Sequence, residues 1–345
     1  MKIPILNLYY LISYASGILN PAREKVPAGI DDGYNLADLY ARLLSEGIEN
    51  LFSRGLYRQY VGHVEDIACI RGQLQFSESL RQNKFHNGRA VCKFDELHPD
   101  ILVNQLLKAG MVRLLMYRNL NHDLTIKLRT LVRRMAHISE ISLQPQAFGR
   151  LMLNRNMLRY RFLLFITRMV MEHSSVREDG DEVRFIDLER DEDKLATLFE
   201  AFVRNFYDVE LADYVIARRK LSWSFELGEE DKFIPQMQTD IPLESERDIF
   251  IIDTKYYASA LKDNRYGTAK FSSSNMYQMF AYMEHYPNPK GKPLTGILLY
   301  PKVSDSLDMR ARSNRNPLHE MRFQTLDLSV PWPEIRKELL NLVSS

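Results

Sequence analysis

Asp253 opens an Asp-Thr-Lys triplet directly after four apolar residues, Ile249–Ile252. A short apolar run bounded by polar residues is typical of a β-strand that is buried on both faces. Strand side chains alternate between faces, so Asp253 and Lys255 are expected on one side and Thr254 on the other. The sequence therefore predicts a buried strand that ends with a carboxylate and an ammonium group at the rim of a sheet.

Asp240 supplies a second carboxylate on the preceding segment, where it is expected in the middle of a strand between apolar neighbours. A turn near residues 244–248 makes the two strands an antiparallel pair. Carboxylates that converge from different elements bind a hard divalent cation, which activates water for phosphodiester hydrolysis. Asp240, Asp253 and the carbonyl group of Thr254 are therefore candidate metal ligands. Lys255 is predicted to orient the attacking water or to stabilise the transition state.

The same triplet also fits a plain surface ion pair. An exposed Asp253–Lys255 pair at a strand end stabilises a protein by at most about 1 kcal/mol and needs no catalytic role. Similar triplets occur at Glu192–Lys194 and Glu230–Lys232, both in polar surroundings without a buried strand before them. The triplet alone leaves both interpretations open.

A helix expected over Asn275–His285 carries two further candidates, Gln278 and Tyr282. They are four positions apart and therefore share one face of the helix. Each can hold the backbone or a phosphate near a metal. The alternative is a helix that packs its aromatic residues into the core and leaves Gln278 exposed. Glu200, on an earlier amphipathic helix, is either another metal ligand or a solvated position.

The C-terminal half is predicted to form an α/β domain over 176–345, because its elements alternate between helices and strands. The polar, turn-prone stretch Ser174–Asp181 marks the predicted boundary. Lys262, Arg265 and Lys270 follow the Asp-Thr-Lys strand and are predicted to contact DNA phosphates.

Residues 1–175 are predicted to form a separate α+β region. It contains an opening amphipathic helix, a small β unit at about 57–95 and a helical part over 100–173. The net charge of +1 gives no global basic field, so any nucleic-acid surface must be local. The two cysteines fit a reducing cytoplasm, and no uncharged stretch is long enough to span a membrane.

Asp240, Asp253-Thr254-Lys255 and Gln278-x-x-x-Tyr282 together resemble the PD-(D/E)xK nuclease superfamily, whose RecB-like branch carries the helical Gln-x-x-x-Tyr. One departure is that a threonine precedes Asp240 where the motif has proline. Over most of its length the chain also resembles the McrC family, the nuclease subunits of the McrBC modification-dependent (type IV) restriction systems. The segments that carry this second resemblance are Ile3–Ala15, Ile70–Leu74, Phe185–Glu192, Thr239–Ile241 and Asp253–Tyr257.

The resemblance implies a mixed central sheet flanked by helices and an endonuclease that needs Mg²⁺, with Mn²⁺ able to substitute. Its substrate would be double-stranded DNA that contains modified cytosine. Its partner would be a hexameric McrB-like AAA+ GTPase, which the N-terminal region would stimulate. The chain has no Gly-x-x-x-x-Gly-Lys-Ser/Thr phosphate loop, so the partner is expected to bind the GTP.

Tyr9, Tyr10 and Arg71 are the residues expected at the contact with that partner. Two other functions remain open. One is a non-catalytic adaptor that activates a AAA+ partner and only holds DNA. The other is a stand-alone RecB-like repair nuclease, which would digest DNA ends without a GTPase.

Overall fold

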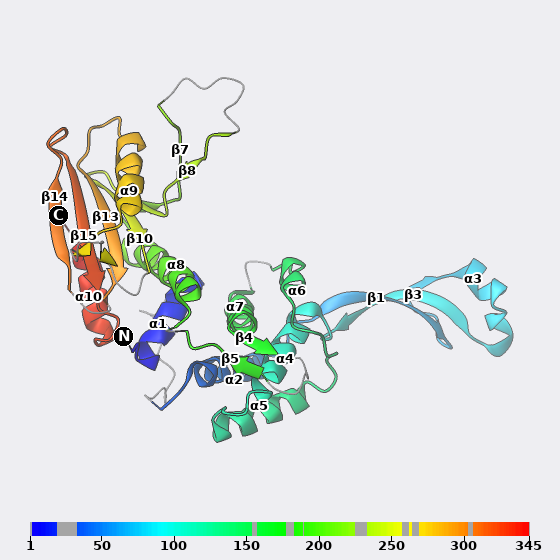
Figure 1. Cartoon of the computed structure of the whole chain (residues 1–345). Helices are drawn as coiled ribbons and strands as arrows, with labels where there is room; N and C mark the ends of the chain where they lie inside the picture. Colours follow the sequence, from blue (N-terminus) through cyan, green and yellow to red (C-terminus); the bar gives the residue numbers. More distant parts are fainter. Residues whose placement is uncertain are drawn as a thin grey trace. The chain divides into compact units, whose positions relative to one another are not determined.

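The structure, a computed structural model, describes residues 2–18, 33–153, 157–176, 183–188, 190–224, 233–256, 262–263, 269–302 and 306–344. The chain divides into two compact units. Unit 1 combines Met1–Leu36 with Ile186–Ser345, and unit 2 comprises Ala37–Phe185. Each unit has its own sheet and helices (Figure 1).

A six-stranded mixed sheet forms the centre of unit 1. Its three middle strands run parallel, and the strands outside them run antiparallel to their neighbours. The sequence-based expectation of an antiparallel pair before the Asp-Thr-Lys triplet is confirmed. From edge to edge the strands are β14 (Asp308–Arg312), β15 (His319–Leu326), β13 (Leu294–Pro301), β10 (Ile249–Thr254), β9 (Ile241–Glu244) and β6 (Val215–Ile216).

Helix α9 (Ser273–His285) covers one face of this sheet (Figure 1). Its Met279 and Met283 pack with Ile249 and Ile251, which share the β10 face that also carries Asp253. The helix approaches β13 closely at Gly296, where an added Cβ would lie 2.6 Å from the Met283 sulfur atom. The small residue lets the helix that carries the candidate site lie directly on the strands.

Helices α8 (Glu192–Glu210) and α10 (Trp332–Leu342) cover the opposite face, and α1 (Ile5–Ala15) packs against these two helices. An aromatic cluster joins the three helices. Its members are Tyr14, Phe202, Phe206 and Trp332. Two short antiparallel pairs complete the unit: β7 (Lys220–Leu221) with β8 (Met237–Gln238), and β11 (Lys262–Asp263) with β12 (Ala269–Lys270).

Helix α1 belongs to unit 1, whereas the sequence assigned it to a separate N-terminal region over 1–175. Nine of its eleven residues are buried, so it needs enclosure on nearly every side. The Asn7 amide group donates hydrogen bonds to the carbonyl oxygens of Leu328 and Val330, both at 2.8 Å. Tyr14 donates to the carboxylate of Glu210 at 2.6 Å. These long-range contacts place the first helix in the core formed by the C-terminal half.

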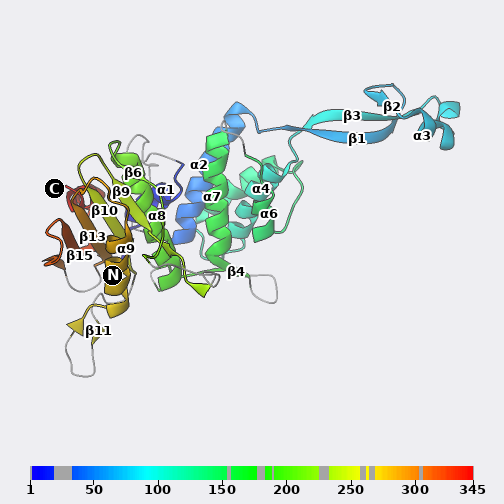
Figure 2. The same cartoon turned by 90° about the horizontal axis from the view of Figure 1, so that it is seen from above.

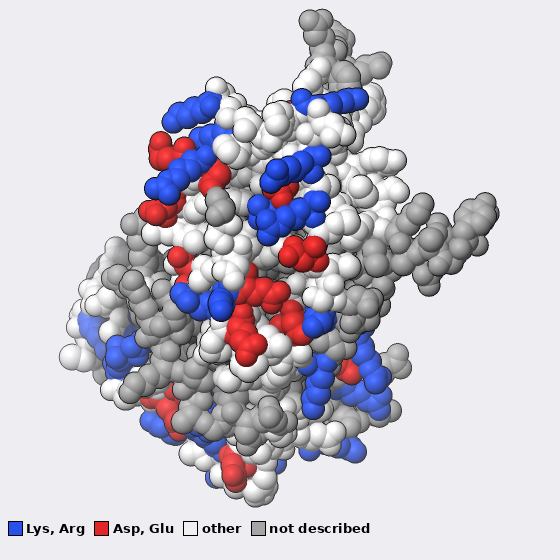
Figure 3. Space-filling view, turned by 90° about the vertical axis from the view of Figure 1, so that its left-hand side faces the viewer, with Lys and Arg blue, Asp and Glu red and all other residues white. Residues whose placement is uncertain are grey.

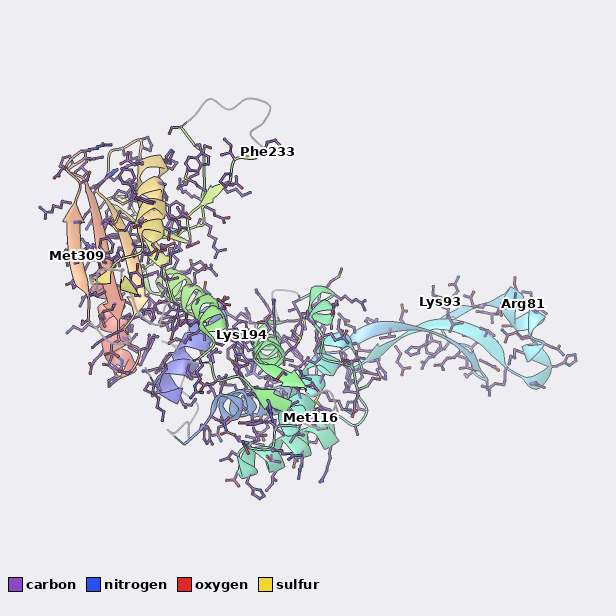
Figure 4. The ribbon with its side chains drawn as sticks, in the orientation of Figure 1. Arg81, Lys93, Met116, Lys194, Phe233 and Met309 are labelled. Atoms are coloured by element: carbon purple, nitrogen blue, oxygen red, sulfur yellow. The ribbon has the colours of Figure 1, made fainter. Side chains whose placement is uncertain are left out.

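Unit 2 combines a helical part with a long ribbon of two strands. The ribbon pairs β1 (Gln59–Ile67) antiparallel with β3 (Ala90–His98), and Figures 1 and 2 show it extending from the helices of the same unit. The short strand β2 (Gln73–Leu74) is added beside β3. Lys93 lies along the ribbon, and Arg81 lies on the short helix α3 at its far end (Figure 4). The remaining elements are α2 (Leu36–Arg54), α3 (Phe76–Arg81), η1 (Lys84–Asn87), α4 (Leu102–Leu115), α5 (His122–Arg134), α6 (Pro145–Gly149), α7 (Leu158–Glu172), β4 (Ser174–Val176) and β5 (Val183–Phe185).

Asn7→Ala is expected to lower the free energy of unfolding of unit 1 by about 2 kcal/mol or more, because it leaves two carbonyl groups without their buried donor. Urea denaturation of the full chain measures the change. Asn50→Ala, which removes an exposed amide group from α2, is the matched control and should stay within about 0.5 kcal/mol of wild type. Equal stability of the two variants would contradict the role given to α1.

Candidate active site

The end of strand β10 brings an acidic and a basic side chain together. Asp253 is almost fully buried, with 1% of its side chain exposed, while 18% of the Lys255 side chain is exposed. The Lys255 Nζ atom lies 2.9 Å from an Asp253 carboxylate oxygen. Both residues project to the α9 side of the sheet, as the alternation of strand side chains predicts. Because Asp253 is buried, the Asp253–Lys255 pair is not the exposed surface ion pair that the sequence left open.

Asp240 lies near enough to Asp253 to contribute to the raised pKa of the Asp253 carboxyl group. Asp240 lies in a bend between β8 and β9, so the expectation that it lies in the middle of a strand is wrong. The residue before it, Thr239, still pairs with Arg219: its backbone N–H donates to the Arg219 carbonyl oxygen at 3.0 Å, and its buried hydroxyl group accepts from the Arg219 backbone N–H at 3.1 Å. The bend at Asp240 therefore follows directly after the last paired residue of this segment.

Burial raises the pKa of Asp253 to about 7, and the adjacent Asp240 carboxyl adds to the shift against the opposing effect of Lys255. Two carboxyl groups and one ammonium group leave one negative charge uncompensated when all three are ionised. Neither Asp253 oxygen accepts a well-directed hydrogen bond among the described residues. A buried carboxyl group with unused oxygen atoms beside the half-buried Asp240 fits a divalent cation better than it fits a closed structural network.

Helix α9 fixes the position of the lysine through two linked side chains. The Lys255 ammonium donates to the Gln278 carbonyl oxygen at 3.1 Å, and the Gln278 amide donates to the Tyr282 hydroxyl oxygen at 2.7 Å. Tyr282 is 6% exposed, and its pKa is raised by burial, with smaller contributions from Asp240 and Asp253. The structure thus joins Gln278 and Tyr282 to the same cluster, and Gln278 is not merely exposed.

Glu200 is not part of this cluster in the structure. Its carboxylate pairs with Arg204 on the same helix, at 3.1 Å, and with Arg218. Neither arginine is predicted from the sequence as a partner of Glu200, although the basic pair of residues 218 and 219 is visible there. Among the described residues no group of three or more His, Cys, Asp or Glu side chains is arranged to hold a metal. A cation here would be held by two carboxylates together with backbone, water or substrate oxygens, as is common for Mg²⁺.

The other predicted residues lie apart from the acidic pair or outside the described side chains. Thr254 is the last residue of β10, and its side chain points to the face opposite Asp253. Lys262 and Lys270 are register partners in the β11–β12 pair, but their side chains and the whole of Arg265 lie outside the described residues.

The three residues expected at a partner contact differ in exposure. Tyr9 is 3% exposed and therefore presents almost no surface. The Tyr10 ring stacks on Trp332 with the ring centres 4.2 Å apart. Arg71 is half exposed, lies 3.8 Å above the Phe94 ring and pairs with Glu96. Of the three, only Arg71 is placed where a partner could readily reach it.

A family described as "McrBC 5-methylcytosine restriction system component" matches residues 7–301 of the chain. The chain belongs to this McrBC family. A relative from Escherichia coli (strain K12), named "Type IV methyl-directed restriction enzyme EcoKMcrBC", is 31% identical over 342 residues, which cover 99% of this chain and 97% of the relative. The match includes both units, so the family likeness is not confined to the candidate site.

One solved structure has a similar fold over nearly the whole chain. It is described as a refined half-complex from a tetradecameric assembly of Thermococcus gammatolerans McrB AAA+ hexamers with bound McrC. The match covers 99% of this McrBC family member and 76% of the solved chain, with a TM-score of 0.57 and 16% sequence identity. At that identity the likeness concerns the fold. No described helix is long and apolar enough to cross a bilayer.

The raised pKa of Asp253, about 7, gives a test of the acidic pair by pH. Between about pH 4 and pH 7 the folded state keeps a proton on Asp253 that the unfolded chain has released. The protonated Asp253 therefore stabilises the folded state relative to the ionised one. Without divalent cations, this stabilisation is complete below about pH 4 and is lost as the pH rises to about 7. Asp253→Asn should therefore be more stable than wild type above pH 7, by about 1 kcal/mol or more.

Urea denaturation at a series of pH values, in the presence of a chelator, measures this difference. Asp208→Asn, which removes an exposed carboxyl group from α8, is the matched control. Stability profiles of wild type and Asp253→Asn that run parallel across this pH range would show that Asp253 is not under the strain inferred from its burial.

Proposed function

We propose that unit 1 is a PD-(D/E)xK-type endonuclease that cuts double-stranded DNA containing modified cytosine with the help of Mg²⁺. The observation that carries the proposal is the buried Asp253 beside Asp240, with Lys255 held next to it by Gln278. Family membership supports DNA as the substrate, because the family is described as a 5-methylcytosine restriction system component. The E. coli relative is likewise named a methyl-directed restriction enzyme.

Asp240 and Asp253 are the residues that would hold the cation, with the Thr254 carbonyl group as a further oxygen donor. A bound Mg²⁺ would supply Lewis-acid chemistry, polarising the phosphate and making a coordinated water more acidic. Asp253 is buried and Asp240 is half-buried, so both carboxylates act where electrostatic interactions are stronger than in open water. Their mutual repulsion in the empty site favours the binding of positive charge.

Lys255 is the residue that would stabilise the negative charge that develops on the phosphate. Its ammonium group is held between the Asp253 carboxylate and the Gln278 carbonyl oxygen, so its position is set before substrate binds. Tyr282 fixes Gln278 in turn. Lys255 would contact the reacting groups, whereas Gln278 and Tyr282 act by positioning it.

We also propose that unit 2 contacts a hexameric McrB-like AAA+ GTPase, which binds GTP, translocates DNA and recognises the modified base. The solved structure with a similar fold contains McrB AAA+ hexamers with bound McrC, according to its description. The β1–β3 ribbon exposes several large apolar side chains, a feature of surfaces that bind other proteins. They include Tyr60 (75% exposed) and Val64 (62%) of β1 and Leu97 (45%) of β3.

Asp253→Asn and Lys255→Ala are each expected to slow DNA cutting by about 100-fold or more, because each removes a charged group from the reacting centre. Cutting of a plasmid that carries modified cytosine is measured with the chain assembled on its GTPase partner and GTP. Stimulation of GTP hydrolysis is measured in the same mixtures and should be unchanged. Lys290→Ala, an exposed lysine of unit 1, is the matched control.

Normal cutting by both Asp253→Asn and Lys255→Ala would favour the non-catalytic adaptor instead. Digestion of DNA ends by the chain without a GTPase would favour the stand-alone repair nuclease. Loss of both cutting and GTPase stimulation would mean that the substitutions act on folding or assembly and would leave the catalytic assignment without support.

Mg²⁺ is expected to raise the melting temperature of the wild-type chain, because a ligand that binds only the folded state stabilises that state. At a concentration one hundred times its dissociation constant, such a ligand raises the free energy of unfolding by about 2.7 kcal/mol. Asp240→Asn and Asp253→Asn should abolish the shift, and Asp208→Asn should retain it. A shift that survives both substitutions would contradict the metal site. A smaller shift in Glu200→Gln would add Glu200 as a third ligand, which the Arg204 and Arg218 pairs do not suggest.

A further inference from the structure

A cavity of about 850 Å³ lies in unit 1 at the end of the sheet opposite to the candidate active site. Its floor includes Phe250 near the beginning of β10, whereas Asp253 lies near the end of that strand. The two residues are three positions apart, so their side chains point to opposite faces of the sheet. The cavity is therefore separate from the acidic pair and is divided from it by the sheet itself.

Four arginines and two acidic residues line this cavity. Both acidic side chains already have partners within the protein. Asp248 accepts hydrogen bonds from the hydroxyl groups of Tyr214, at 2.9 Å, and Ser245, at 2.6 Å. Glu320 accepts from the Arg322 side chain at 3.2 Å.

Arg322, the innermost of the arginines, is also used internally. It is 7% exposed and donates to the Leu342 carbonyl oxygen at 3.1 Å, which compensates the partial negative charge at the end of α10. The remaining three, Arg247, Arg310 and Arg312, are exposed. Arg310 has one distant partner, Asp308 at 3.9 Å, and no ion pair of Arg247 or Arg312 is found among the described residues. The rim of the cavity thus carries positive charge that the described structure does not neutralise.

The register of the edge strand brings like charges together at one position. Arg310 of β14 lies directly opposite Arg322 of β15, whereas Arg312 lies opposite the acidic Glu320. Like charges that face each other across an antiparallel pair destabilise it, unless an anion lies between them. All five residues of β14 are exposed, and Figure 4 shows Met309 at this outer edge of the sheet. In Figure 3, which looks onto this side of the molecule, lysine and arginine side chains gather on the upper part of the face with acidic ones among them.

We propose that this cavity binds phosphate groups of the DNA backbone at a position remote from the cutting site. The guanidinium groups of Arg310 and Arg312 match phosphate oxygens in geometry and charge. The choice of DNA as the ligand rests on the proposed function of unit 1. The cavity would hold a stretch of backbone other than the one being cut, because the sheet separates it from Asp253.

The test measures the binding of a short labelled DNA duplex to the full chain. Fluorescence anisotropy reports the binding, in the presence of EDTA and at KCl concentrations between about 50 and 200 mM. Arg310→Ala/Arg312→Ala should bind more weakly and lower the slope of log K against log[KCl] by about 1.8, since each phosphate contact contributes about 0.9. Arg310→Lys/Arg312→Lys should recover most of the slope. Arg129→Ala/Arg133→Ala removes the same charge from exposed positions of α5 and should leave the slope unchanged.

Equal slopes for the Arg310→Ala/Arg312→Ala and Arg129→Ala/Arg133→Ala variants would overturn the proposal, as would a wild-type chain whose binding does not depend on salt. Deoxyadenosine monophosphate is titrated in parallel. If Arg310→Ala/Arg312→Ala loses only mononucleotide binding, the cavity serves a free nucleotide and not DNA. Because EDTA removes divalent cations, the outcome does not depend on cutting, and failure of the proposed nuclease activity would be seen separately in the plasmid assay.

Discussion

The burial of the Asp253 carboxyl group near that of the half-buried Asp240 is the feature on which the candidate site depends. Ionised carboxylates are stable in the interior only when opposite charge or hydrogen-bond donors compensate them. Here burial, with the adjacent Asp240, raises the pKa of Asp253 to about 7 against the opposing effect of the single ammonium group of Lys255. A folded protein keeps such strain where binding of a ligand can relieve it. Under the proposed function, the same two carboxyl groups would favour the binding of a divalent cation.

The frame around this pair explains why it can persist. Strand β10 lies inside the sheet between β13 and β9, so its backbone is fixed on both sides. Helix α9 packs closely on the same face and supplies Gln278 and Tyr282 as supports for Lys255. On the other face of the sheet, an aromatic cluster packs α1 together with α8 and α10. Rigid elements position reactive side chains more accurately than loops do.

Much of the site could be predicted from the sequence because its information is local. The apolar run before Asp253 and the alternation of strand side chains place Asp253 and Lys255 on one face of the sheet. Helical spacing places Gln278 and Tyr282 together on one face of their helix. The bend at Asp240 could not be predicted in this way, since it depends on the pairing of Thr239 with Arg219 across twenty positions. The ion pairs of Glu200 with Arg204 and Arg218 likewise follow from tertiary packing. The helical periodicity of α1 was visible, but nothing local to it indicates the distant residues, such as Leu328, that enclose it.

Anomalous X-ray scattering from crystals of the chain soaked in Mn²⁺ tests the central claim most directly, because it locates the ion without relying on activity. The proposal predicts a peak in contact with carboxylate oxygens of both Asp240 and Asp253 and next to the Lys255 side chain. A map with no peak between these two carboxylates, or with manganese bound only elsewhere in unit 1, would contradict it.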